Sequence, residues 1–269
     1  MTISPQPTEH GDARCDQGDG DDRGGLVRAS EQDRLYADAL AAVERFVFDE
    51  RVAAVFPDMI RRSVPGYATV IGMLGVIAER YAQPQSRVYD LGCSLGAATA
   101  VMRARVSAAG CRFVAIDNAP AMVTRARETF DSIAGPAVEV QCADIREVPI
   151  SDASVVVLNY TLQFVPPAER QALLARIRAG MRPGGVLVLS EKIEGADPEE
   201  DRRLIELHHA FKRANGYSEL EISQKRAALE QVLIPETLAA HRARLQSAGF
   251  RAVDVWFQCC NFASLLAYA

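Results

Sequence analysis

The chain has 269 residues, of which 49% are hydrophobic, and a formal net charge of -5 at pH 7. This length and apolar content allow a full core, so we expect one α/β domain with additions. The negative charge argues against a protein that binds nucleic acid tightly through its phosphates.

Several other classes are also disfavoured. The six cysteines show no C-x-x-C spacing and the four histidines form no H-E-x-x-H pattern, so we predict no metal and reduced thiols. No apolar run approaches the ~18 residues of a membrane span, and the N-terminus lacks an apolar signal core. We therefore expect a cytoplasmic protein without membrane contact.

The N-terminal part divides into two predicted regions. Residues 1–33 are rich in Gly, Asp, Pro and Gln and are predicted to be a disordered extension. Residues 34–86 are predicted to form N-terminal helices that cap a cofactor site. Apolar spacing indicates a helical pattern over 31–47, a helix from Pro57 to Val64, and another from Tyr67 to about Tyr81.

From residue 87 onward, short apolar strands alternate with helices. Strands are predicted at 87–91, 112–117, 138–142, 154–158 and 186–190, with a final pair at 252–257 and 262–267. Such alternation predicts a mainly parallel seven-stranded sheet with helices on both faces. Ligands of such a sheet bind at the carboxyl ends of its strands.

Residues 197–232 interrupt this alternation. They are helical in pattern and highly charged, and a helix over 235–248 follows them. We predict that they form a lid or dimerisation insert within the α/β domain, which spans residues 87–269.

The first strand ends in the turn Asp90-Leu-Gly92-Cys-Ser94-Leu-Gly96. Gly92 and Gly96 have no side chain, so the backbone of this turn can approach a small ligand closely. The spacing differs from the G-x-G-x-x-G of dinucleotide-binding folds. It resembles the D-x-G-x-G-x-G turn of class I S-adenosylmethionine (SAM) enzymes, with Ser94 in place of the middle glycine. The alternative is a turn that only lets a strand and a helix pack.

Polar residues also follow the next three strands. Asp117 and Asn118 end the second, and an acceptor-only carboxylate there suits the ribose hydroxyls. Asp144 and Ile145 end the third strand and suit adenine, because Asp144 can accept from its exocyclic amine and Ile145 can pack against its ring. Asn159 ends the fourth strand. Each could instead be a cap or a loop acid, and Asn118 is also predicted to cap the helix after it. Together at one sheet edge they favour a SAM site.

Longer stretches resemble the carboxy-S-adenosyl-L-methionine (carboxy-SAM) synthase family. They are residues 51–60, 62–67, 88–99, 157–164, 211–226 and 256–259. The resemblance runs from about residue 48 to the C-terminus and does not include residues 1–47. The block Phe211-Lys-Arg-Ala-Asn-Gly-Tyr-Ser-Glu-Leu-Glu-Ile-Ser-Gln-Lys-Arg226 is specific and is not shared by methyltransferases in general. The resemblance implies a Rossmann-like class I SAM-methyltransferase fold.

The resemblance also implies a reaction. The enzyme would convert SAM and prephenate to carboxy-SAM and phenylpyruvate, without a metal. A partner carboxymethyltransferase would use carboxy-SAM to form 5-oxyacetyluridine at the tRNA wobble position, so this acidic chain need not bind tRNA itself. A homodimer is implied as well.

The site residues implied by matched position lie along the whole chain. They are Tyr67, Gly92, Cys93, Ser94, Asp117, Asn118, Asp144, Ile145, Asn159 and Arg226. Arg226 would bind the new carboxylate of the product and is the catalytic candidate, because its planar guanidinium suits a carboxylate. Without the family block, a Lys-Arg pair is more often a solvated part of a helix surface.

Two other functions are kept as alternatives: a SAM-dependent methyltransferase of a small molecule and a non-catalytic SAM-binding regulator. After the fourth strand the chain reads Asn159-Tyr-Thr-Leu-Gln-Phe164, which lacks the Asn-Pro-Pro-aromatic run of many nitrogen methyltransferases. No Ser or Cys nucleophile with a paired base is evident.

Overall fold

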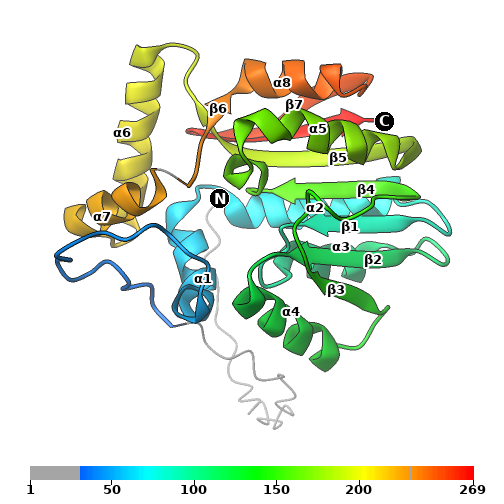
Figure 1. The fold of residues 1–269 in the computed structure, drawn as a ribbon, viewed down its shortest axis with the longest axis horizontal. Coiled ribbons are helices and arrows are strands. Elements are labelled where there is room, and N and C mark those ends of the chain that lie inside the picture. The colour runs from blue at the N-terminus through cyan, green and yellow to red at the C-terminus, as the bar shows by residue number, and fades with distance from the viewer. Residues whose placement is uncertain (1–30, 231) are drawn as a thin grey trace, which may run out of the picture.

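The structure is a computed structural model that describes residues 31–230 and 232–269. One twisted sheet lies between layers of helices (Figure 1). Its strands follow the order β3-β2-β1-β4-β5-β8-β7, and a short strand, β6, pairs with the end of β5. The bounds are β1 Arg87–Leu91, β2 Arg112–Asp117, β3 Val138–Cys142, β4 Ala153–Asn159, β5 Met181–Glu194, β6 Glu236–Thr237, β7 Ala252–Cys259 and β8 Phe262–Tyr268.

The pairing confirms the predicted fold class. Strands β1 to β5 run parallel, and β8 is antiparallel to both β5 and β7. Strand order reverses at β1, which pairs with β2 on one side and β4 on the other. Open α/β sheets bind ligands at the carboxyl ends of the strands on either side of such a reversal, which are β1 and β4 here.

Apolar side chains on both faces of the central strands explain why helices cover both faces. Val155 and Val157 of β4 pack with α2 (Tyr67–Tyr81) and α3 (Ala97–Arg105). Val156 and Leu158 point the other way and pack with α5 (Pro167–Ala179) and α8 (Leu238–Ser247). The helix α4 (Pro120–Ser132) lies along β2 and β3 (Figure 1).

The N-terminal region differs from its prediction. Residues 34–49 contain no helix, so the helical pattern predicted over 31–47 is wrong. The polar backbone of this segment binds the insert instead: the Gln224 amide donates to the carbonyls of Tyr36 and Asp38 and accepts from the N–H of Leu40. These tertiary bonds replace the intrahelical ones. Of the extension predicted over residues 1–33, residues 1–30 lie outside the described residues.

Helix α1 (Glu50–Ser63) begins earlier than predicted and continues through Pro57. Its start is set by Asp49, whose carboxylate accepts the Val52 N–H at 3.0 Å. The predicted insert does form two helices, α6 (Pro198–Ala214) and α7 (Glu219–Leu229). Both lie beyond the edge at which β4 ends (Figure 1).

A buried ionic network joins α5, β6 and α8. Arg170 has 0% of its surface exposed and donates to the carbonyls of Val165 and Ile234, both at 2.8 Å. It also pairs with Glu236, which Arg244 binds from α8. His241 lies beside this network, and neither of its ring nitrogens has a partner among the described residues. Burial lowers the pKa of His241 to about 4.

We expect the substitution His241→Leu to stabilise the protein most at acidic pH. The unfolded imidazole takes up a proton below about pH 6.5, whereas the folded one stays neutral down to about pH 4. The folded state therefore loses stability as pH falls through this window, by about 2 kcal/mol at pH 5. Urea unfolding at pH 7 and pH 5 measures the effect. An identical pH dependence in variant and wild type would contradict it.

Candidate active site

The turn after β1 has a backbone that favours glycine at several positions. Gly92, Ser94 and Gly96 have φ angles of 83°, 50° and 86°. A Cβ at Gly92 would overlap the Thr161 side chain, and one at Gly96 would lie 2.6 Å from the Phe130 ring. Ser94 therefore adopts the left-handed conformation that glycine usually supplies in this turn.

Hydrogen bonds tie this turn to the end of β2. The N–H groups of Gly92 and Cys93 donate to the Ile116 carbonyl at 2.7 and 2.9 Å. The Ser94 N–H donates to the Asp117 carboxylate at 2.8 Å. Burial raises the pKa of the Cys93 thiol, which argues against a role as a nucleophile.

Asp117 also organises the start of α4. Its second oxygen accepts the Ala119 N–H at 2.9 Å. Asn118 is exposed, and the N-cap residue of α4 is Ala119, without a side-chain cap. The prediction that Asn118 caps this helix is wrong, because the neighbouring carboxylate takes the free N–H. Each Asp117 oxygen keeps a further lone pair for a ligand hydroxyl.

Asp90 is a buried acid that the sequence placed in the motif but not among the site residues. Its Oδ2 accepts from the N–H and the hydroxyl of Thr99 at 3.0 and 2.6 Å, while its Oδ1 has no partner among the described residues. Burial raises the pKa of Asp90 to about 6. Its position at the tip of a buried strand was the signal that could have identified it.

Two more unpartnered polar atoms lie at the neighbouring strand end. Asn159 Oδ1 and the Tyr160 hydroxyl are buried without a hydrogen bond among the described residues. Asp90 lies opposite Val157 in the sheet, so Asp90 and Asn159 share one face. The Tyr67 and Tyr160 rings lie 6.2 Å apart, and burial together with the Asp90 charge raises the pKa of Tyr67. These atoms are suited to bind the polar groups of a ligand.

The loop after β4 is held by a buried carboxylate. Glu191, with 0% exposure, accepts the N–H groups of Leu162 and Gln163 at 2.9 and 2.8 Å. The Tyr160 N–H donates to the Ser190 carbonyl at 2.7 Å. Burial raises the pKa of Glu191 to about 8, while its two N–H donors favour the charged form. Two bonds to the Glu191 side chain and one to the Ser190 carbonyl therefore fix the loop to β5.

Asp144 and Ile145 lie at the end of β3, as predicted. Ile145 is 8% exposed and belongs to the core. Asp144 pairs with Arg146, whose Nε lies 3.0 Å from its carboxylate, and this ion pair lowers the pKa of Asp144. The sequence analysis missed Arg146, although it stands only two residues further along the chain. An adenine amine at Asp144 would share the carboxylate with Arg146.

Arg226 lies apart from the other nine predicted site residues, on α7. It is exposed and lines a shallow hollow of about 290 Å³ with His209 and Ile222. It makes no ion pair or hydrogen bond within the described part of the chain. Its charge is among the causes that lower the pKa of Lys192, close to the strand edge.

Lys225, the residue before Arg226, is buried instead. Its ammonium pairs with Asp33 at 3.4 Å, and Tyr217 also donates to Asp33. Asp33 is 2% exposed, so the packed part of the chain already includes the last residue of the predicted extension. Arg62 lies 4.0 Å above the Tyr217 ring and pairs with Asp58 at 3.1 Å. This cluster joins α7 to α1 and to the N-terminal segment.

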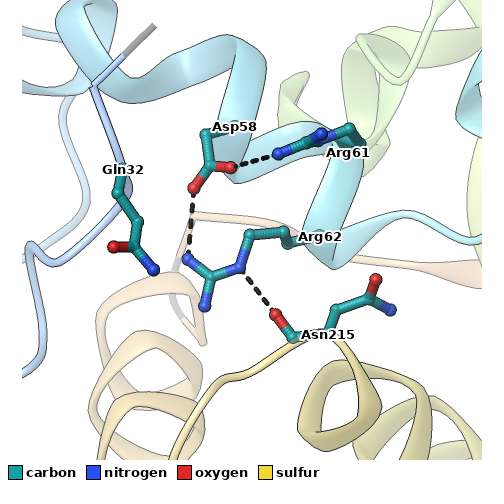
Figure 2. A pocket seen from close by; sticks show the side chains of 5 residues that line it. All are labelled: Gln32, Asp58, Arg61, Arg62 and Asn215. Carbon is teal, nitrogen blue, oxygen red and sulfur yellow. Dashed lines mark hydrogen bonds and ion pairs between the residues drawn. The ribbon is translucent and has the colours of Figure 1, made fainter.

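A pocket of about 560 Å³ opens beside this cluster, lined by Gln32, Asp58, Arg61, Arg62 and Asn215. Figure 2 shows Asp58 bonded to both arginines, and Arg62 bonded to the Asn215 carbonyl at 2.7 Å. Its charged groups already satisfy one another, and none of its residues lies at a strand end. We therefore assign it no ligand.

No group of three or more His, Cys, Asp or Glu side chains within residues 31–230 and 232–269 could hold a metal ion. None of the helices in that part of the chain is both long and apolar enough to cross a membrane.

Comparison with known proteins identifies the family. Residues 88–185 match a methyltransferase-domain family. The chain is 61% identical over 237 residues to the carboxy-SAM synthase of Trichlorobacter lovleyi, covering 87% of this chain and 97% of that one. It is 54% identical over 239 residues to the carboxy-SAM synthase of Klebsiella pneumoniae, covering 88% and 97%. The chain belongs to the carboxy-SAM synthase family. It is a SAM-dependent transferase, and SAM is its substrate.

Solved structures agree with this fold. Human N-acetylserotonin methyltransferase, in complex with SAM, gives a TM-score of 0.54 at 19% identity over 81% of this chain and 55% of its own. Mitomycin 7-O-methyltransferase gives 0.55 at 14% identity over 82% and 57%. The synthase chain therefore spans little more than half of each, and the likeness shows the class I SAM-methyltransferase fold alone.

We expect Gly92→Ala to weaken SAM binding by roughly 10- to 100-fold, because a methyl group there strains φ and displaces Thr161 from the site. Gly72→Ala is the matched control, since Gly72 is an exposed residue of α2 with nothing within 4 Å of its added Cβ. Calorimetric titration with SAM measures both, and thermal melts confirm folding. Wild-type affinity in folded Gly92→Ala would place the ligand elsewhere.

Proposed function

We propose that this enzyme converts SAM and prephenate to carboxy-SAM, phenylpyruvate and water. The feature that carries the proposal is the block of residues 211–226, which forms the end of α6 and most of α7 and ends in Arg226, an exposed cation whose charge acts on Lys192 of β5. The names of the relatives support carboxy-SAM as the product. A plain methyltransferase would need no such cation.

The chemistry needs little from the protein's own acids and bases. Prephenate loses its ring carboxyl as carbon dioxide when the ring becomes aromatic, and its hydroxyl leaves with the electron pair. The departing hydroxide takes a proton from the sulfonium methyl and becomes water. The carbanion adds to the carbon dioxide and forms the new C–C bond, so atoms and charge balance. The site must hold these species together and exclude water.

In our proposal, different residues at the strand ends bind different parts of SAM. Gly92, Cys93 and Ser94 line the methionine part of SAM, with Tyr67 over its amino-acid end and Asn159 on its polar groups. The adenosine part is bound by four residues at the ends of β2 and β3: Asp117, Asn118, Asp144 and Ile145. The unpartnered oxygens of Asp90 and Asn159 support this assignment, because buried acceptors require a donor.

We further propose that the product leaves to a partner enzyme in the cytoplasm, a carboxymethyltransferase acting on the wobble uridine of tRNA. The net charge of -5 fits a protein that supplies a small molecule and does not itself hold tRNA. Dot-blot or filter binding of labelled tRNA to the purified enzyme tests the second point. Salt-sensitive retention at micromolar protein would contradict it.

We expect purified enzyme incubated with SAM and prephenate to yield a nucleoside one carboxyl group heavier than SAM. Prephenate labelled with ¹³C in its ring carboxyl should pass the label to that nucleoside, as mass spectrometry would show. Omitting prephenate is the control and should leave SAM unchanged. A methylated compound would indicate a methyltransferase. Bound SAM without phenylpyruvate would indicate a regulator.

We expect Arg226→Ala to keep SAM affinity and to lose about 10- to 100-fold in carboxy-SAM affinity, the value of one charge-assisted hydrogen bond. Arg202→Ala is the control, since Arg202 is an exposed arginine of α6 that pairs with Glu206. Calorimetric titration with each nucleoside gives both affinities. An equal loss of affinity for SAM and for carboxy-SAM would contradict the role assigned to Arg226.

We also propose a homodimer in which a second copy covers exposed apolar residues of the insert, such as Leu207 at 54% and Leu220 at 40% exposure. A monomer by light scattering would contradict it.

In such a dimer, Arg226 could serve the site of its own subunit or the site of the partner subunit. Mixing Arg226→Ala subunits with Gly92→Ala subunits distinguishes these two arrangements. Activity returns only if Arg226 serves the partner's site, and stays absent if it serves its own.

A further inference from the structure

Lys192 is a cation near the strand edge that lacks a partner. Its backbone N–H donates to Gln163 Oε1 at 3.0 Å. Its side chain is only partly exposed, and its ammonium forms no ion pair or hydrogen bond with any residue that the structure describes. A partly buried ammonium without an ion-pair partner is unfavourable, so an anion bound beside Lys192 would stabilise it.

The register of the sheet places Lys192 next to the SAM site. In the sheet, Ser190 lies opposite Asn159 of β4, and Lys192 lies opposite Phe262 of β8. Alternate residues of a strand share a face, so Lys192 and Ser190 lie on the face of the sheet that carries Asn159. The Phe262 ring lies 6.0 Å from the ring of Tyr160, whose buried hydroxyl is unpartnered. Phe262, which lies opposite Lys192, is therefore close to a second group without a partner.

Charges of both signs lie around Lys192. Burial lowers the pKa of Lys192, and the Arg226 charge acts in the same direction, while Asp201 and Glu194 oppose it. The pKa of Lys212 is lowered to about 7 by burial and by the charges of Lys225 and Lys192. Cations that repel one another in a partly buried region bind an anion favourably.

We propose that Lys192 binds a carboxylate of the second substrate, a small dicarboxylate, and that it holds the carboxylate which survives the reaction. This inference rests on the proposed function. Of the two carboxyl groups of prephenate, the ring carboxyl leaves as carbon dioxide, so only the 2-oxo acid carboxylate can serve as a fixed anchor. Holding that end directs the ring carboxyl toward the sulfonium methyl, while Arg226 remains free for the carboxylate formed on the product.

The test compares Lys192→Met, which keeps the length of the side chain without its charge, with Lys192→Arg, which keeps the charge. Arg203→Gln is the control, because it removes an exposed cation of α6 that pairs with Glu199 at 2.8 Å. Steady-state assays give kcat and the KM for prephenate. Calorimetry gives SAM affinity and the affinity of prephenate for enzyme loaded with S-adenosylhomocysteine, which cannot react.

We expect Lys192→Met to raise the KM and the dissociation constant for prephenate by about 10- to 100-fold, with SAM affinity unchanged, and Lys192→Arg to restore most of the loss. Unchanged prephenate binding in folded Lys192→Met would overturn the inference while the proposed function stands. Equal weakening of SAM and prephenate would also overturn it. If the wild-type enzyme binds prephenate and Lys192→Met does not, but the wild type makes no carboxy-SAM, the inference is supported and the proposed function is overturned. Failure of the wild type to bind prephenate would overturn both.

Discussion

The site depends on the close approach of the Gly92 backbone to the Thr161 side chain, which leaves no room for a Cβ. This contact joins the turn after β1 to the loop after β4, across the point where strand order reverses. The Ile116 carbonyl fixes one side of the junction by accepting two N–H groups, and Glu191 fixes the other in the same way. A ligand at this junction therefore meets a backbone held in place by its neighbours on both sides.

Around this junction the protein leaves polar atoms without partners. Asp90 Oδ1, Asn159 Oδ1 and the Tyr160 hydroxyl are all buried, and each unsatisfied group costs about 1–3 kcal/mol. Their occurrence at neighbouring strand ends distinguishes them from scattered defects of packing. SAM carries an ammonium, a carboxylate, ribose hydroxyls and an amine, so it can supply both donors and acceptors to such an edge.

The insert is positioned by buried charge and carries an exposed guanidinium. Lys225 and Arg226 are adjacent on α7, yet one is 5% exposed and paired with Asp33 while the other faces outward. Neighbouring residues on a helix point about 100° apart, so a single turn can both anchor itself and present a guanidinium. The anchor reaches the N-terminal segment, which therefore contributes to the placement of Arg226.

The sequence by itself determined the sheet, the glycine turn and most of the strand-end residues, because apolar runs and glycine positions act locally. It did not determine the N-terminal segment, where Leu35, Val43 and Phe46 have helical spacing but bury against other elements without forming a helix. Only the tertiary structure decided that Asp117 rather than Asn118 accepts the N–H of Ala119 at the start of α4. It also decided that Arg146 pairs with Asp144, and that the Lys192 ammonium forms no ion pair within the described residues. These outcomes depend on which side chains meet from distant parts of the chain, and no local pattern encodes that.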